Sequence, residues 1–240
     1  MTWQESWTNR FYRSRPGWTD GTTEFHALCR AHVPTKARIL EVGAGPTNST
    51  SAFLASLGEV HGVDVDAEVL TNVHLASSSV LDRGHFPFSD ASFDAVVSNY
   101  VVEHVDDARL HLGEISRVLV GGGRYVFRTP NLLHYVALVS RLTAHGTHLL
   151  LANRLRNLPT DNHDPWPTVY AMNTPAAVRR YAGLAGLDVE SLEMVEKEPS
   201  YGMFARPLFL AFMAYERLVN ASAVFGSLRS NMFVVLRKKS

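Results

Sequence analysis

One short segment constrains the fold more than any other. Residues 37–42 form an apolar run typical of a buried strand, and a Gly-Ala-Gly-Pro turn follows at residues 43–46. Ser49, Thr50 or Ser51 can cap a helix that runs to about residue 57. A strand, a glycine turn and a helix in this order let a ligand approach the backbone closely. Alone, the pattern is weak, because many α/β proteins use such a turn only for packing.

The rest of the chain continues the alternation of strands and helices. Further strands are predicted at residues 59–65, 78–81, 93–98, 124–129, 187–196 and 231–238. Helices are predicted at residues 3–15, 22–32, 67–75, 108–120 and 174–183. This alternation predicts an α/β fold with a mostly parallel sheet and helices on both of its faces.

We expect a single domain over residues 1–240, with an N-terminal helical cap at 1–33 and insertion or lid segments at 131–172 and 200–228. The stretch 131–172 is longer than an ordinary connection. Its individual histidines, His134 among them, are expected to be surface or capping residues. The apolar part of the later segment, 203–226, is read first as a core or lid helix, next as a dimer face, and last as a membrane contact.

Composition excludes several classes of function. Lys plus Arg equals Asp plus Glu at 23 each, and no basic stripe is present, which argues against a nucleic-acid partner. The single cysteine, Cys29, fits a reducing cytoplasm. No signal peptide is recognised, and the most apolar run, 207–219, is too short to span a bilayer. We therefore expect a cytoplasmic protein, without stable membrane insertion, that is a monomer or a homodimer.

Two further features limit which class of ligand the turn could bind. Asp64 ends the second strand about twenty residues beyond the glycine turn, where a carboxylate can accept hydrogen bonds from the ribose hydroxyls of a nucleoside. The alternative role, a cap for the following helix, suits Asp66 better. A dinucleotide fingerprint requires a third glycine where this chain has Asn48, which favours a ligand without a pyrophosphate. Glu41, two positions before the first glycine, also favours a ligand without a pyrophosphate.

In this context the chain resembles the class I methyltransferases that use S-adenosylmethionine (SAM). The match spans about residues 37–130 and, more weakly, 173–197. Five motifs in the correct order carry it, which is far more specific than one glycine loop: Ile39–Gly45; His61–Asp66; Asp82–Phe88; Phe93–Asn99 with Val102–Val105; and Glu114–Leu119 with Gly121–Gly123. The resemblance implies a Rossmann-like seven-stranded fold whose last strand is antiparallel.

The resemblance also implies roles for particular residues. The glycine turn would lie against the methionine part of SAM, Asp64 would bind the ribose, and Asp82 would accept a hydrogen bond from the adenine amine. The full set of implied cofactor-binding residues is Glu41, Gly43, Ala44, Gly45, Asp64, Val65, Asp82, Arg83, Asn99, Tyr100 and Tyr12. Tyr12 would reach the methionine carboxylate if the N-terminal segment acts as a lid, and it is a packed helix residue otherwise. One departure is Thr47-Asn48, where a further glycine is common and where Asn tolerates a left-handed backbone.

The catalytic candidates lie after the fourth strand. His104 can act as a general base, since histidine titrates near neutral pH, or it can serve the architecture beside the cofactor. Glu103 is a candidate substrate contact. Some relatives bind a divalent ion through a Glu-x-x-Glu-His motif and a later His. Tyr100 replaces the first carboxylate here, so we expect no metal, although His163 could supply the later ligand.

The sequence therefore predicts an enzyme that transfers a methyl group from SAM to a small, partly apolar acceptor. O-methylation is favoured, then N- and then C-methylation. The Asn-Pro-Pro-Tyr type motif of nucleic-acid amide methylators is absent, since Ser98–Val101 occupies that place. Two alternatives stay open: an enzyme that uses SAM for cyclisation or elimination, and a non-catalytic SAM-binding partner protein.

Overall fold

The computed structural model describes residues 2–82, 84–135, 167–199, 203 and 205–240. The chain divides into two compact units. A sheet unit comprises Phe25–Pro130, Pro167–Glu193 and Met232–Ser240. A helical unit comprises Met1–Glu24, Asn131–Trp166 and Met194–Asn231. The single-domain organisation stays a prediction.

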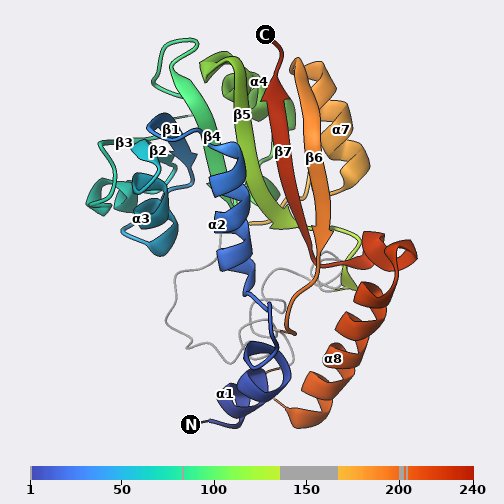
Figure 1. Cartoon of the computed structure of the whole chain (residues 1–240). Coiled ribbons are helices and arrows are strands. Elements are labelled where there is room, and N and C mark those ends of the chain that lie inside the picture. The colour runs from blue at the N-terminus through green and yellow to red at the C-terminus, as the bar shows by residue number, and fades with distance from the viewer. Residues whose placement is uncertain (1, 83, 136–166, 200–202, 204) are drawn as a thin grey trace. The chain divides into compact units, whose positions relative to one another are not determined.

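Seven strands form one sheet within the described part of the chain, in the order β3-β2-β1-β4-β5-β7-β6 (Figure 1). Their bounds are β1, Ala37–Val42; β2, Gly58–Asp64; β3, Ser77–Val80; β4, Phe93–Asn99; β5, Leu119–Pro130; β6, Leu187–Val195; and β7, Asn231–Lys238. Strand β1 pairs in parallel with β2 and β4, β2 with β3, and β4 with β5. Strand β7 runs opposite to its neighbours (Figure 1), which confirms the predicted sheet.

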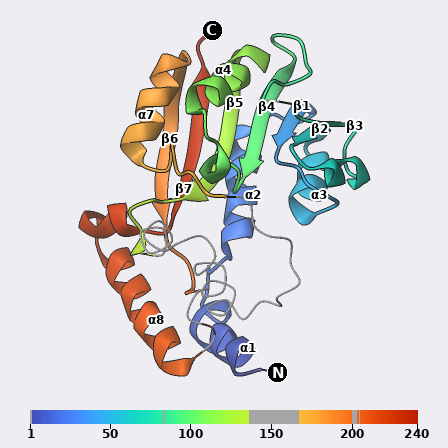
Figure 2. The same cartoon turned by 180° about the vertical axis from the view of Figure 1, so that it is seen from behind.

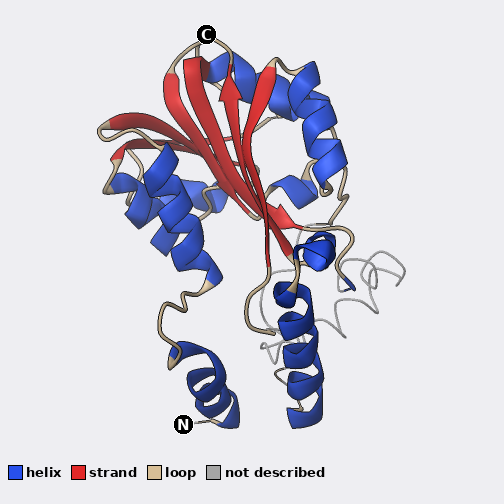
Figure 3. Ribbon diagram, turned by 45° about the vertical axis from the view of Figure 1, so that its right-hand side comes forward, coloured by secondary structure: helices blue, strands red, loops and turns tan. Residues whose placement is uncertain are grey.

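Helices cover both faces of this sheet, as Figures 2 and 3 show. They are α2, Gly21–His32; α3, Ser49–Ala55; α4, Ala108–Val118; and α7, Pro175–Leu184, with short 3-10 turns η2, Ala67–Thr71, and η3, Val102–His104. Ile39, Leu40 and Val97 are fully buried in the central strands. Such continuous apolar runs are expected where a parallel sheet is covered on both sides.

The helical unit contains α1, Trp3–Thr8; a π-helical turn η1, Asn9–Arg13; α8, Arg206–Ala221; and η5, Ala223–Leu228. The aromatic stripe of the N-terminal segment packs against buried Phe209 of α8, with Trp7 centred 5.5 Å from it. His134 is buried and lies 3.6 Å from the Glu196 carboxylate, so its expected surface role is wrong. Burial lowers the pKa of His134 to about 4. Most of the predicted insertion, including residues 136–166, lies outside the described residues.

Two local predictions are wrong, and a third holds with a change of helix type. The helix expected at residues 67–75 is a 3-10 turn that ends at Thr71, because the buried side chain of Asn72 turns back toward the glycine loop. The helix expected at residues 3–15 is present from Trp3 to Arg13, and it changes from α to π after Thr8. The cap of α3 is Asn48 rather than one of the three hydroxyl residues that follow it.

The loop between β3 and β4 is fastened to α4 by Arg117. Its guanidinium donates to the backbone carbonyls of Phe86 and Phe88 and to the carboxylate of Glu114. Glu114 in turn accepts the backbone N–H of Phe86 at 2.8 Å. This planar set of bonds holds the segment that follows Asp82.

We expect Arg117→Lys to lower the free energy of unfolding by about 1–2 kcal/mol, since an ammonium cannot reproduce the fork of a guanidinium. Urea unfolding followed by circular dichroism measures the change. Arg179→Lys, on the exposed face of α7, is the matched control and should stay within about 0.5 kcal/mol of the parent. Equal effects of the two substitutions would contradict the anchoring role of Arg117.

Candidate cofactor site

The glycine turn is built from two left-handed residues. Gly43 has φ +72° and Gly45 has φ +55°. A Cβ on Gly43 would also lie 2.2 Å from Cγ2 of Val101, so only glycine fits there. The backbone N–H groups of Gly43 and Ala44 donate to the carbonyl of Val63 at 2.8 and 3.2 Å. The turn is therefore closed onto β2 rather than open along its inner edge.

Two asparagines hold the turn from the outside. Asn48 accepts the N–H groups of Thr50 and Ser51 with its side-chain oxygen and donates its amide to the carbonyl of Ala44. Its backbone is extended at φ −148°, so the left-handed conformation expected to replace a missing glycine is not needed. Buried Asn72 donates to the carbonyls of Ala44, Gly45 and Pro46 and to Ser51 Oγ. Sequence reasoning missed Asn72, because no spacing rule connects it to the turn.

Asp64 is fixed by two backbone donors. Its Oδ2 accepts the N–H of Gly45 and its Oδ1 accepts the N–H of Asp66, both at 2.9 Å. Asp66 caps η2 by accepting from Glu68, as the sequence predicted. Val65 lies between the two aspartates and is 54% exposed. The Asp64 carboxylate is thus aimed at the turn and retains lone pairs for further donors.

Glu41 lies beneath the turn and is only 4% exposed. Its Oε2 accepts a hydrogen bond from Ser51 Oγ at 2.7 Å. Burial raises the pKa of Glu41 to about 7, the charge of Asp64 acts in the same direction, and the bond from Ser51 opposes both. This carboxyl group therefore changes its protonation near neutral pH.

Asp82 follows β3 and forms an isolated antiparallel bridge with His85. It lies on the exposed side of a turn that leads into the anchored segment at Phe86. Arg83, the predicted backbone neighbour of the adenine, lies outside the described residues. The adenine contact of Asp82 stays a prediction.

The end of β4 carries Asn99 and Tyr100 beside Arg128 of β5. The Arg128 Nε donates to Asn99 Oδ1, and its guanidinium carbon lies 4.4 Å from the centroid of the Tyr100 ring. Tyr100 is one of few described non-glycine residues with a left-handed backbone, at φ +59°. Asn99 also donates to Thr50 Oγ1 of α3 at 3.4 Å. These two predicted cofactor residues therefore lie on the same side as the first turn of α3.

The two catalytic candidates occupy η3 but differ in exposure. Glu103 is 5% exposed, and its Oε2 accepts from Thr129 Oγ1 at 3.0 Å. Burial raises the pKa of the Glu103 carboxyl group. His104 is partly exposed, and its Nδ1 donates to the Pro167 carbonyl at 3.1 Å. That bond leaves the lone pair of the neutral ring on Nε2.

Tyr12, the remaining cofactor candidate, belongs to the helical unit. Its hydroxyl donates to Glu216 Oε2 at 3.2 Å, and its side chain is 1% exposed. Burial raises the pKa of this hydroxyl, and the charge of Glu216 raises it further. Its contact with a methionine carboxylate stays a prediction.

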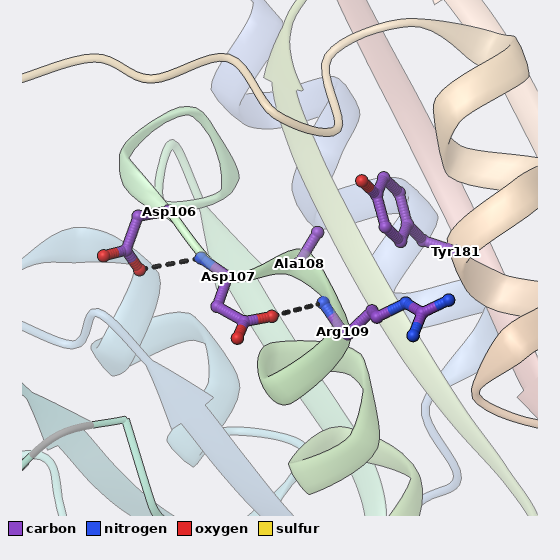
Figure 4. A pocket seen from close by; sticks show the side chains of 5 residues that line it. All are labelled: Asp106, Asp107, Ala108, Arg109 and Tyr181. Atoms are coloured by element: carbon purple, nitrogen blue, oxygen red, sulfur yellow. Dashed lines mark hydrogen bonds between the residues drawn. The ribbon is translucent and has the colours of Figure 1, made fainter.

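A separate shallow pocket of about 280 Å³ lies at the start of α4 (Figure 4). It is lined by Asp106, Asp107, Ala108, Arg109 and Tyr181. Asp107 caps α4, and Asp106 accepts the N–H of Asp107, so both carboxylates already have structural partners. None of these residues belongs to the predicted cofactor set. Among the described residues no group of three or more side chains suits a metal ion, and no described helix could cross a membrane.

Comparison with known proteins agrees with this geometry. Residues 40–127 match the family described as "Methyltransferase domain". The uncharacterized methyltransferase YcgJ of Bacillus subtilis (strain 168) is 30% identical over 162 residues, 61% of this chain and 58% of that protein. The malonyl-[acyl-carrier protein] O-methyltransferase of Erwinia billingiae (strain Eb661) is 34% identical over 96 residues, 38% of each protein.

This chain is therefore similar to methyltransferase domains over residues 40–127. The matched segment contains all the candidate cofactor and catalytic residues except Tyr12. This chain spans less than two thirds of the length of both relatives. Among solved structures, the [4+2]-cyclase SpnF matches with a TM-score of 0.58 at 18% identity, covering 94% of this chain and 83% of that one. That likeness shows the fold of the domain alone.

We expect Glu41→Gln to remove the contribution of the Glu41 carboxyl group to the pH dependence of the free energy of unfolding. Between the ordinary pKa of 4.5 and the folded value of about 7, the folded chain holds a proton that the unfolded chain releases. Stability of the parent therefore falls as pH rises through this range, and the variant should be more stable above pH 7 by about 2–3 kcal/mol. Urea unfolding from pH 4 to 8 measures both profiles, and parallel profiles would contradict the assignment.

Proposed function

We propose that this chain binds SAM at the carboxyl ends of β1, β2 and β4 and transfers its methyl group to a small, partly apolar acceptor. One observation carries the choice of cofactor. The amides of the glycine turn are bonded to Val63 and Asp64, and Asn48 caps the first amides of α3. A pyrophosphate needs such amides free, whereas a nucleoside held by a carboxylate does not.

The residues present fit this cofactor. Asp64 is held in place by Gly45 and Asp66 and can still accept from two ribose hydroxyls. Glu41 supplies a buried carboxyl group that a cationic amino group would hold in its charged form. The left-handed Gly45 has no atom within 4 Å of the position of a Cβ, so a ligand can approach its backbone there.

The chemistry follows from the nature of the methyl donor. A sulfonium makes its methyl group electrophilic, so the chain must align the acceptor in line and exclude water. For a hydroxyl acceptor we assign His104 as the general base, with Nε2 taking the proton while Nδ1 stays bonded to Pro167. A substrate contact by Glu103 would use Oε1, because Oε2 is bonded to Thr129.

O-methylation is the favoured outcome, and the O-methyltransferase name of the Erwinia billingiae relative supports it. The balanced charge of the chain favours a small molecule over nucleic acid as the acceptor. Cytoplasmic function and a monomeric or homodimeric state belong to the same proposal.

Titration calorimetry with SAM tests the cofactor. We expect Asp64→Ala to weaken SAM binding at least tenfold, because the ribose acceptor and the fixed Gly45 amide are both lost. Asp66→Ala is the matched control: it removes only the cap of η2, so binding should change less than threefold. Absence of SAM binding by the parent, or binding of NAD instead, would overturn the proposal.

His104→Asn separates base catalysis from architecture. The Asn amide can still donate to Pro167, but nothing replaces Nε2. With a hydroxyl acceptor found by screening with isotopically labelled SAM, methyl transfer should fall about 100-fold at unchanged SAM affinity. Full activity in this variant would assign His104 to architecture. Consumption of SAM without an acceptor, yielding methylthioadenosine, would point to the non-methylating alternative.

A further inference from the structure

We propose that Arg128 is the positioning residue that sets Asn99 and Tyr100 for cofactor binding. The inference rests on the proposed function, since it concerns the same SAM site. Arg128 lies just beyond the segment that matches the methyltransferase family, at the carboxyl end of β5. Its side chain is buried, at 5% exposure, and reaches both residues at the end of β4.

Arg128 decides which way the Asn99 amide points. Its Nε donates to Asn99 Oδ1, so the amide nitrogen must face the other way, toward Thr50 Oγ1 at 3.4 Å. Thr50 in turn bonds His26 Nε2 of α2 at 3.2 Å. Without the guanidinium, the two ends of the amide would have no fixed preference. Arg128 therefore sets the orientation of the Asn99 amide in the hydrogen-bonded series that runs from His26 through Thr50 and Asn99 to Arg128.

The Arg128 guanidinium also contacts the ring of Tyr100, whose backbone is left-handed. The backbone N–H of Tyr100 donates to the Arg128 carbonyl at 3.0 Å, and the ring lies over the guanidinium. A left-handed non-glycine residue costs about 1 kcal/mol or more and persists only where its surroundings fix it. Phe25 of α2 lies near the same guanidinium, 5.3 Å from centroid to carbon. These contacts join α2, β4 and β5 at one cation.

The burial of a cation at this position is not explained by core packing alone. Removing a charge from water is expensive, and an apolar side chain of similar volume packs a core at least as well. Lysine would keep the charge but lacks the planar Nε–H that meets Asn99 while the plane faces an aromatic ring. The geometry thus uses features that only arginine combines.

A double-mutant cycle tests the role, with SAM affinity measured by titration calorimetry. We expect Arg128→Met and Asn99→Ala each to weaken SAM binding at least tenfold. If Arg128 acts through Asn99, the double variant should be no more than threefold weaker than the poorer single variant. Arg124→Met, four residues earlier on β5 and paired with Glu190, is the matched control and should bind SAM within twofold of the parent.

A second pair of variants keeps the test decisive if Arg128→Met does not fold. Arg128→Lys retains the charge, and Tyr100→Gly removes the ring while easing the left-handed backbone. Each should weaken SAM binding, and the two effects should not multiply. A folded Arg128 variant with the parent's SAM affinity, or effects that multiply in either cycle, would overturn the role of Arg128. A parent that binds no SAM would instead contradict the proposed function.

Discussion

The site depends on one carboxylate, that of Asp64. It accepts the backbone N–H of Gly45 on one oxygen and that of Asp66 on the other. One side chain therefore fixes both the glycine turn after β1 and the chain that leaves β2. Since Gly43 and Ala44 also donate to Val63, the turn is bonded to β2 along its length. Charge-assisted bonds of this kind are stronger than neutral ones, so the turn is held firmly against β2.

Two buried glutamates of the sheet unit have similar surroundings. Glu41 and Glu103 each accept from one neighbouring hydroxyl, Ser51 and Thr129. Burial raises the pKa of both. The favourable contacts of these carboxyl groups do not compensate for the lost water, so each favours its protonated form more than an exposed glutamate does.

Glu103 also organises the chain around it. Its backbone carbonyl accepts the N–H groups of Val169 and Tyr170, and Thr129 accepts from the Asn173 amide. Asn173 further donates to the carbonyl of Pro130. The end of β5 and the chain before α7 are therefore tied to η3, which places His104 by contacts distant in sequence.

The sequence by itself determined the sheet, its order of elements and the position of the glycine turn, because strand and helix periodicities and turn residues are local properties. It also separated Asp64 from the cap Asp66, since cap geometry depends on adjacent residues. It could not predict the hydrogen bond of Asn72 to Ser51 or that of Arg128 to Asn99. The partners in these bonds are 21 and 29 positions apart in the sequence. Only the tertiary structure decided these contacts, because they depend on which strand ends meet at one edge of the sheet.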